Sequence, residues 1–193
     1  MDPAANEWAQ HRKTVHHFNE PGHAHELTFS CYQRRPLLVE DGRKVILSEA
    51  IDRAVSHHGF RLVAFVYMPE HVHLVVFPHS ADARVEQLLY AIKRPTSFRV
   101  KQQLEAAGSD LVHTLRVLER PGKMAFRFWQ EGPGYDRNIT DPDALREAVD
   151  YIHSNPVRRG LVETPDGWRW SSWRWYHERT HDAALPTAHG WPS

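Results

Sequence analysis

The chain has 193 residues, which is long enough for one domain with a sizeable core and too short to expect two. Its 24 Lys and Arg residues balance 24 Asp and Glu residues, so the net charge does not indicate nucleic-acid binding, and any DNA site must be a local patch. The single cysteine excludes an internal disulfide and suits a reducing cytoplasm. No apolar run approaches the ~18 residues of a membrane span, and no signal peptide is expected.

The hydrophobic pattern alternates between strand and helix periods along the chain. The predicted elements are, in order, a strand over 27–32, a helix over 44–58, a strand pair or one bent strand over 61–77, a helix over 85–107, short strands over 111–117 and 124–128, and a helix over 141–154. Asp141 is expected to cap the last helix, and the Asn155-Pro156 pair is expected to end it. This order predicts an α+β fold, an antiparallel sheet with helices on one face.

These elements predict a single domain over residues 23–176. Residues 1–22 are polar and contain two prolines and a glycine, so we expect a flexible N-terminal arm. Residues 177–193 are expected to form a loose C-terminal tail.

Two histidines in the middle of the chain carry the clearest functional signal. His71 and His73 stand at positions i and i+2 of a β-rich run, and alternate residues of a strand point to the same side. Two neutral imidazoles on one face can hold a divalent cation when a third ligand comes from elsewhere. For such a pair taken alone, hydrogen bonding to nearby backbone is the commoner explanation, so the neighbouring motifs decide.

Four motifs that follow one another along the chain define a family resemblance. Residues 67–76 (Tyr-Met-Pro-Glu-His-Val-His-Leu-Val-Val) resemble the Met-Pro-Asn-His-Val-His-Leu-Leu-Val segment of the single-tyrosine HUH transposases, above all the REP-associated tyrosine transposases. Residues 128–137, 151–162 and 168–172 are similar to that family's Trp-Gln-x-Gly-x-Tyr-Asp-Arg, Tyr-Ile-His-x-Asn-Pro-Val-Lys-x-Gly-Leu-Val and Trp-x-Trp-Ser-Ser elements. Four matches in the same order are far more specific than any one of them.

The resemblance implies a ferredoxin-like HUH palm whose open sheet face binds DNA. It also implies a cytoplasmic transposase that acts on single-stranded or hairpin DNA, as a monomer or a homodimer. In this family a divalent ion, Mg²⁺ or Mn²⁺, would be held by His71 and His73 and would polarise the scissile phosphate. A helix-borne tyrosine then attacks the phosphate, which forms a 5′-phosphotyrosine and frees a 3′-hydroxyl.

The nucleophilic tyrosine is missing where we expect it. Relatives often carry Tyr-x-x-x-Gln on a helix, because a four-residue step puts the nucleophile and a metal-ligating amide on one face. On the helix over 85–107, Phe98 and Gln102 have that spacing, but Phe98 has no hydroxyl, and a second register falls on Pro95. Helical geometry favours Phe98, which lies opposite the apolar stripe. Tyr90 shares its face but stands about 18 Å from Gln102, which makes it a poor substitute.

Basic side chains near this helix are the candidate DNA contacts. They are Lys93, Arg94, Arg99 and Lys101 on the helix, and Arg137, Arg158 and Arg159 in segments that match the family. Without the family match, a solvated charged surface would be the simpler explanation of these residues.

Several other residues allow two explanations. Glu70, which stands where relatives more often have Asn, adds a carboxylate near the metal or caps the turn. Tyr135 and Tyr151 are interpreted as structural or DNA-contacting, because the nucleophile is expected on the earlier helix. For the tryptophans, core packing is favoured over base stacking; they are Trp168, Trp170, Trp173 and Trp175.

The sequence therefore supports two main functions. One is a transposase-like enzyme that cleaves DNA and transfers strands with metal assistance and an unorthodox nucleophile. The other is a catalytically silent, domesticated DNA-binding module, which the missing tyrosine favours. The retained His71, His73 and Gln102 favour surviving chemistry, and a nuclease that uses metal-activated water is a third possibility.

Overall fold

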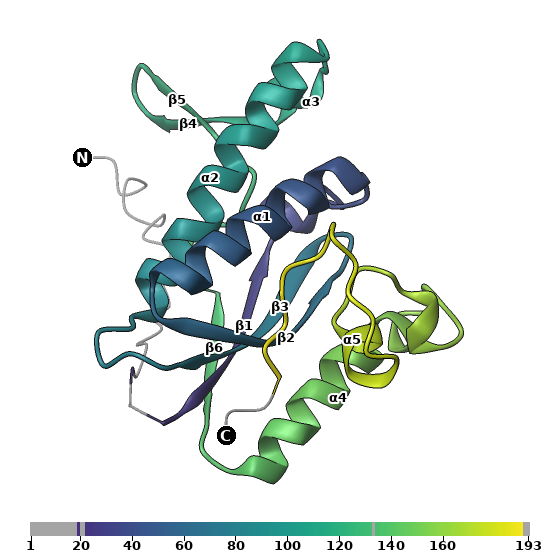
Figure 1. Cartoon of the computed structure of the whole chain (residues 1–193). Helices are drawn as coiled ribbons and strands as arrows, with labels where there is room; N and C mark the ends of the chain where they lie inside the picture. Colours follow the sequence, from purple (N-terminus) through teal and green to yellow (C-terminus); the bar gives the residue numbers. More distant parts are fainter. Residues whose placement is uncertain (1–18, 20–21, 133, 191–193) are drawn as a thin grey trace, which may run out of the picture.

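A four-stranded antiparallel sheet organises the chain, with strands in the order β2-β3-β1-β6 (Figure 1). The computed structural model describes residue 19, residues 22–132 and residues 134–190. The strands are β1 (Ala24–Ser30), β2 (Phe60–Tyr67), β3 (His71–Pro78) and β6 (Tyr135–Ile139). The α+β class and the antiparallel sheet are thus as predicted, although β6 was not expected from the sequence.

Helices cover both faces of this sheet. On one side lie α1 (Asp41–His57) and α2 (Val85–Ala106), and on the other lies α4 (Pro142–Arg158) (Figure 1). The expectation that helices occupy one face only is wrong, because the middle strands carry apolar residues on both faces and each face needs a cover. The face opposite α1 and α2 is therefore only partly open.

The sheet residues alternate between two cores. The α1/α2 core contains Val72 and Leu74 of β3, whereas the α4 core contains Val75 together with Val149 and Ile152 of α4. Strand alternation then assigns the odd-numbered residues at the start of β3 to the α4 side. This parity decides which helix the two histidines face.

The α4 helix starts as predicted and ends later. The Asp141 side chain accepts a hydrogen bond from the Ala144 N–H at 2.8 Å, and Pro142 occupies the first turn. The helix continues past Asn155-Pro156 to Arg158. The predicted stop is wrong because Pro156 is buried in the last turn, where the proline removes a single hydrogen bond and its packing offsets that loss. Asn155 is consequently helical.

The remaining elements are short and lie outside the four-stranded sheet and its three long helices. They are the short helices η1 (Tyr32–Arg34), α3 (Leu111–Thr114), η2 (Pro165–Gly167) and α5 (Trp173–His177), and the hairpin strands β4 (Arg116–Arg120) and β5 (Lys123–Phe126). The α3 turn replaces the first half of the strand expected over 111–117. The β4–β5 hairpin projects sideways, next to the half of α2 that lies farther from the sheet (Figure 1).

The segment after α4 returns along the outer edge of β2. Tyr67 N–H donates to the Trp170 carbonyl at 2.8 Å, and His189 N–H donates to the Leu62 carbonyl at 2.8 Å. Trp170 is buried, as its predicted core role requires. The loose tail over 177–193 stays a prediction, although two of its backbone N–H groups bond to the domain: His189 to the Leu62 carbonyl and Thr187 to Asp52 Oδ1 at 2.8 Å. The predicted arm over 1–22 lies outside the described residues except at 19 and 22.

Among the described residues, none of the helices could span a membrane.

Candidate functional site

His71 and His73 converge at the start of β3, on the α4 side of the sheet. Their Nε2 atoms are 2.9 Å apart, and the two residues are only 6% and 7% exposed. The Nδ1 atom of each ring, which points away from the other histidine, lies within hydrogen-bonding distance of an oxygen. His71 Nδ1 lies 3.1 Å from Glu70 Oε1, and His73 Nδ1 lies 2.8 Å from Thr28 Oγ1. These contacts orient both rings so that their inner nitrogens face one point.

Both imidazoles are neutral near pH 7. Burial lowers the pKa of His71, although the neighbouring Glu70 carboxylate acts in the opposite direction. Burial lowers the pKa of His73 to about 3, and the nearby His71 adds to that effect. A neutral imidazole has a lone pair for a metal ion, so the pair is in the form that binds one.

The α4 helix brings a tyrosine and an amide to the same point. Tyr151 and Asn155 are four residues apart and share one face of the helix. The Tyr151 ring meets the His73 ring edge-on, with centroids 6.2 Å apart, and Asn155 Nδ2 lies 3.3 Å from His73 Nε2. Tyr151 is 41% exposed, so a substrate can reach its ring. The guanidinium of Arg158 lies 4.8 Å from the centre of that ring.

The donor set fits a divalent ion. Two ligand atoms at right angles, each about 2.1 Å from one ion, are about 3.0 Å apart, which matches the separation of the two Nε2 atoms, 2.9 Å. The Asn155 amide can turn its oxygen toward the same point, because the assignment of its N and O atoms depends on the hydrogen-bond partner. An amide oxygen is a ligand that suits Mg²⁺ and Mn²⁺, whereas imidazoles suit transition metals, so the mixed set favours Mn²⁺ over Mg²⁺. Within the described chain, no cluster of three or more His, Cys, Asp or Glu side chains offers an alternative.

The residues predicted on α2 do not join this site. The buried stripe of α2 packs in the α1/α2 core, on the face of the sheet opposite to the histidines. Phe98 is 60% exposed there, and Gln102 is exposed on the same helix. Tyr90 is also exposed, and its hydroxyl accepts a hydrogen bond from Arg94 at 2.7 Å. The expectation that Phe98 and Gln102 occupy the nucleophile and ligand positions is therefore wrong, because the strand parity directs the histidines toward α4.

The basic residues divide between the two faces. On α2, each has a local partner: Lys93 donates to the Gly132 carbonyl, Arg94 to Tyr90, Arg99 to Glu49, and Lys101 lies beside Glu105. The sheet separates these residues from the histidines. That they contact DNA stays a prediction, and such contacts would lie on the face opposite to the histidine site. Arg137, Arg158 and Arg159 lie on the histidine side, and Arg159 donates to Glu70 Oε1 at 2.9 Å.

The position of Tyr151 beside the histidines was not predicted from the sequence. This tyrosine was interpreted as structural or DNA-contacting, although Tyr151-Ile-His-Ser-Asn155 contains the same four-residue step as Tyr-x-x-x-Gln, with Asn as the amide. That spacing was the available signal. The structure adds what spacing alone lacks, namely that this helix faces His71 and His73.

Comparison with known proteins agrees with this geometry. Residues 22–115 match the family described as transposase IS200 like. The chain is 26% identical over 144 residues to a Haemophilus influenzae protein described as a REP-associated tyrosine transposase, covering 70% of this chain and 76% of that one. It is 29% identical over 127 residues to a REP-associated tyrosine transposase of Escherichia coli K12, covering 66% of this chain and 62% of that relative.

The fold has a solved counterpart. The structure of a REP-associated tyrosine transposase bound to a REP hairpin superposes with a TM-score of 0.65 at 20% identity, covering 93% of this chain and 97% of that one. The match extends the similarity of fold beyond residue 115, where the family model ends, and so includes the segment that carries α4.

Proposed function

We propose that this chain cleaves and rejoins single-stranded or hairpin DNA with Tyr151 as its nucleophile, as expected of the IS200-like transposase family whose model matches residues 22–115. One observation carries the proposal: α4 places Tyr151 and Asn155 against the convergent histidines of β3. The curated relatives are named as tyrosine transposases, and the structural neighbour is bound to a hairpin. The cytoplasm is the proposed place of this activity.

The chemical step is a transesterification at one phosphorus. The Tyr151 oxygen attacks, a P–O bond to Tyr151 forms, and the bond to the 3′ oxygen of the preceding nucleotide breaks. The phenolic proton leaves to solvent, which reaches the 41% exposed Tyr151, and the departing 3′ oxygen gains a proton. The product is a 5′-phosphotyrosine and a free 3′-hydroxyl. Attack by a second 3′-hydroxyl on that linkage reverses the chemistry and joins strands.

Each residue of the site has a separate task in this proposal. His71, His73 and Asn155 would hold the divalent ion, which when bound draws charge from the phosphate oxygens. The Arg158 guanidinium, 4.8 Å from the centre of the Tyr151 ring, would supply positive charge near the phosphate as negative charge develops there. Thr28 and Glu70 fix the two imidazole rings. All these residues come from one chain, so a monomer contains a complete site.

The catalytically silent alternative loses its main support. It rested on the absence of a tyrosine from α2, and α2 lies on the other side of the sheet. A nuclease that uses activated water keeps the same ion site but needs no tyrosine. The two mechanisms therefore differ in whether the DNA becomes covalently attached to protein.

The test uses hairpin oligonucleotides that carry a 5′-label and a 3′-label in separate preparations, with Mn²⁺. Wild-type protein should acquire the label downstream of the cleavage site and release a free 3′-hydroxyl fragment, as seen on a denaturing gel. Tyr151→Phe should bind the hairpin with wild-type affinity and form no adduct, whereas Tyr90→Phe should form it normally. Cleavage by Tyr151→Phe without any adduct would establish the nuclease mechanism and refute the proposal.

A further inference from the structure

A two-stranded arm projects from the fold directly after the residues that match the family model. That match ends at residue 115, and the arm is the hairpin of β4 (Arg116–Arg120) and β5 (Lys123–Phe126). Figure 1 shows the arm beside the half of α2 that lies farther from the sheet. Gly122 forms the turn at its tip with a φ of +76°, and a Cβ there would meet nothing within 4 Å. The tip therefore stands clear of the rest of the described chain.

The base of the arm is fixed to the core. Arg127, which follows β5, donates its backbone N–H to the Leu115 carbonyl at 2.8 Å, and Leu115 is fully buried. Phe128 is also fully buried, and its carbonyl accepts a hydrogen bond from Tyr32 N–H at 2.8 Å. In the described chain, β4 and β5 have no third strand beside them. A two-stranded hairpin of this kind is only marginally stable in water, so a partner that covers the arm would stabilise it.

One face of the arm is apolar and open to solvent. Leu118 and Met124 are directly opposite each other in the β4–β5 ladder and are 67% and 55% exposed. Opposite residues of an antiparallel pair point to the same face, so these two side chains form one patch. The cross-strand pair on the other face, Val117 with Ala125, is half-buried. Within the described chain, the Leu118–Met124 face is thus the one that lacks a cover.

Positive charge is concentrated around this patch. Residues 116–127 contain one carboxylate, Glu119, and four cationic side chains, although the whole chain has no net charge; the four are Arg116, Arg120, Lys123 and Arg127. Lys123 and Arg127 both pair with Glu119. Arg120, at the end of β4, is exposed. Since the chain as a whole is neutral, such a local excess of cations is what would attract an anionic partner.

The cations of the arm continue onto α2. Arg116 lies 3.7 Å from Oε1 of Glu105, and Lys101 lies 3.4 Å from the same oxygen. Ion pairs at the surface are weak, so a phosphate can take the place of the carboxylate beside each cation. The arm and the end of α2 therefore form one cationic surface.

The chemistry of the arm selects duplex DNA over a second copy of the chain. Two arms packed together would double the excess of positive charge at one place. The major groove of DNA is about 12 Å wide and admits a two-stranded β-ribbon, and phosphates follow both of its rims. In such a groove Arg and Lys side chains reach phosphates, while apolar side chains meet base edges such as the thymine methyl group. A single strand offers no groove of this kind.

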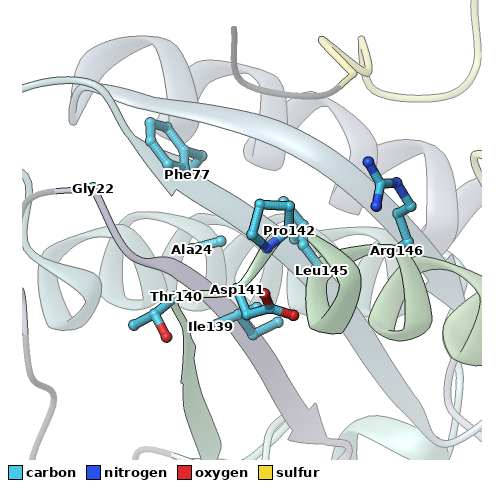
Figure 2. Close-up of a pocket in the computed structure, with 9 residues that line it drawn as sticks. All are labelled: Gly22, Ala24, Phe77, Ile139, Thr140, Asp141, Pro142, Leu145 and Arg146. Atoms are coloured by element: carbon cyan, nitrogen blue, oxygen red, sulfur yellow. The ribbon is translucent and has the colours of Figure 1, made fainter.

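The hollow at the start of α4 does not offer the same chemistry. Figure 2 shows that its lining contains one cation, Arg146, and one carboxylate, Asp141. Arg146 pairs with Asp143, and Asp141 accepts the hydrogen bond from Ala144 N–H that caps the helix. The lining therefore has no excess of positive charge with which to attract a polyanion.

We propose that the β4–β5 arm binds double-stranded DNA in the major groove, at a surface separate from the histidine site. Figure 1 shows the arm beside α2, on the side of the molecule away from α4, which carries Tyr151. DNA in the histidine site and a duplex on the arm thus occupy different surfaces. The arm would hold duplex DNA whether or not the histidine site cleaves a strand, so this inference goes beyond the proposed function and does not depend on it.

The experiment measures binding of a blunt, fluorescein-labelled duplex of about two helical turns by anisotropy at several salt concentrations, with a chelator in place of metal ion. Wild type should bind with a dissociation constant of about 1–100 µM at physiological salt. Arg116→Ala combined with Arg120→Ala should weaken binding and lower the slope of log K against log salt by about two units. Leu118→Ser combined with Met124→Ser should weaken binding about tenfold and keep the slope, because apolar contacts are lost and phosphate contacts are not.

Two substitutions outside the arm serve as matched controls. Arg53→Ala removes one exposed cation from α1, and Val39→Ser removes an apolar side chain that is 57% exposed. Both should bind the duplex as wild type does. All variants should unfold within about 2 °C of wild type, since the changes are at the surface, and this measurement separates lost binding from lost folding.

Wild-type protein that does not bind the blunt duplex would overturn the inference. Equal losses with the duplex and with a hairpin oligonucleotide in the arm variants would also overturn it, because the arm would then hold the stem of the substrate. Duplex binding that disappears in His71→Ala with His73→Ala would place the duplex at the histidine site. Self-association of wild type in sedimentation, absent from Leu118→Ser with Met124→Ser, would assign the apolar patch to a second copy and contradict the proposal.

Discussion

Arg159 donates a hydrogen bond to Glu70 at 2.9 Å, through the same carboxylate oxygen that lies 3.1 Å from His71 Nδ1. Arg159 immediately follows α4, the helix that carries Tyr151, whereas Glu70 immediately precedes β3. This contact therefore ties the tyrosine helix to the histidine strand. Of the two roles considered for Glu70, the structure supports a carboxylate at the site, acting on a histidine ring.

Removal of the Glu70 carboxylate should weaken metal binding. Glu70→Ala leaves His71 Nδ1 without its acceptor, and loss of such a partner costs about 10- to 100-fold in metal affinity. Arg159→Ala should cost less, because Glu70 still faces the ring. Mn²⁺ titration by isothermal calorimetry measures both effects, with Arg53→Ala on α1 as a surface control. Equal Mn²⁺ affinity for Glu70→Ala and wild type would refute this role.

Mn²⁺ binding should require residues of β3 and α4 and should not require residues of α2. His71→Ala combined with His73→Ala should abolish Mn²⁺ binding, since both convergent nitrogens are lost. Asn155→Ala should weaken binding, and Gln102→Ala should leave it unchanged because Gln102 is exposed on the opposite side of the sheet. Electron paramagnetic resonance of titrated Mn²⁺ provides the readout. A loss of affinity in Gln102→Ala with Asn155→Ala unaffected would reverse the assignment.

Phe98→Tyr should change neither activity nor stability. The side chain is 60% exposed on α2, so the added hydroxyl meets solvent, and the free energy of unfolding should stay within about 0.5 kcal/mol of wild type. Adduct formation with hairpin DNA should match wild type in both rate and yield. A gain of cleavage in this variant would show that α2 supplies the nucleophile.

Stability should decrease as the pH falls below about 6.5, and His153 should account for part of the loss. Burial lowers the pKa of His153 to about 3, and its Nε2 lies 2.8 Å from Ser172 Oγ. Between these pH values the unfolded chain binds a proton that the folded chain does not, so unfolding becomes easier as pH falls, by up to about 1.4 kcal/mol per pH unit.

Urea unfolding of wild type and His153→Gln at pH 7.5, 6.0 and 4.5 measures this contribution. The variant is expected to be less stable at pH 7.5 because it loses a packed ring, but its stability should fall less steeply toward pH 4.5. Parallel curves for the two proteins would mean that His153 is protonated in the fold or exposed.

Much of the sheet could be predicted from the sequence, because its apolar periodicity is strong. The run from Phe60 to Phe77 contains enough buried apolar residues to identify two interior strands. The β6 segment, Tyr135–Ile139, was missed because its Asp, Arg and Asn residues have low strand propensity and its outer edge has no partner strand in the described sheet. A strand of this kind is held by its neighbour β1 and is not specified locally.

Only the histidine pair of the candidate site could be predicted from the sequence. The i, i+2 spacing of His71 and His73 requires a shared face, and the structure has one. The local pattern does not tell which helix covers that face, because both α2 and α4 carry an aromatic residue followed four positions later by an amide. These pairs are Phe98 with Gln102 and Tyr151 with Asn155. The parity of β3 and the crossover to α4 decide between them, and neither is visible in a local pattern.

Tyr151 should become covalently bound to DNA, and peptide mapping can identify the modified residue. Wild-type protein is incubated with a hairpin oligonucleotide and Mn²⁺, digested with nuclease and trypsin, and analysed by tandem mass spectrometry for a peptide that carries a nucleotide. We predict a single modified residue, Tyr151, in the peptide that contains Tyr151-Ile-His-Ser-Asn155. A nucleotide on Tyr90, Tyr135 or any other residue, or cleaved DNA with no modified peptide, would contradict the account.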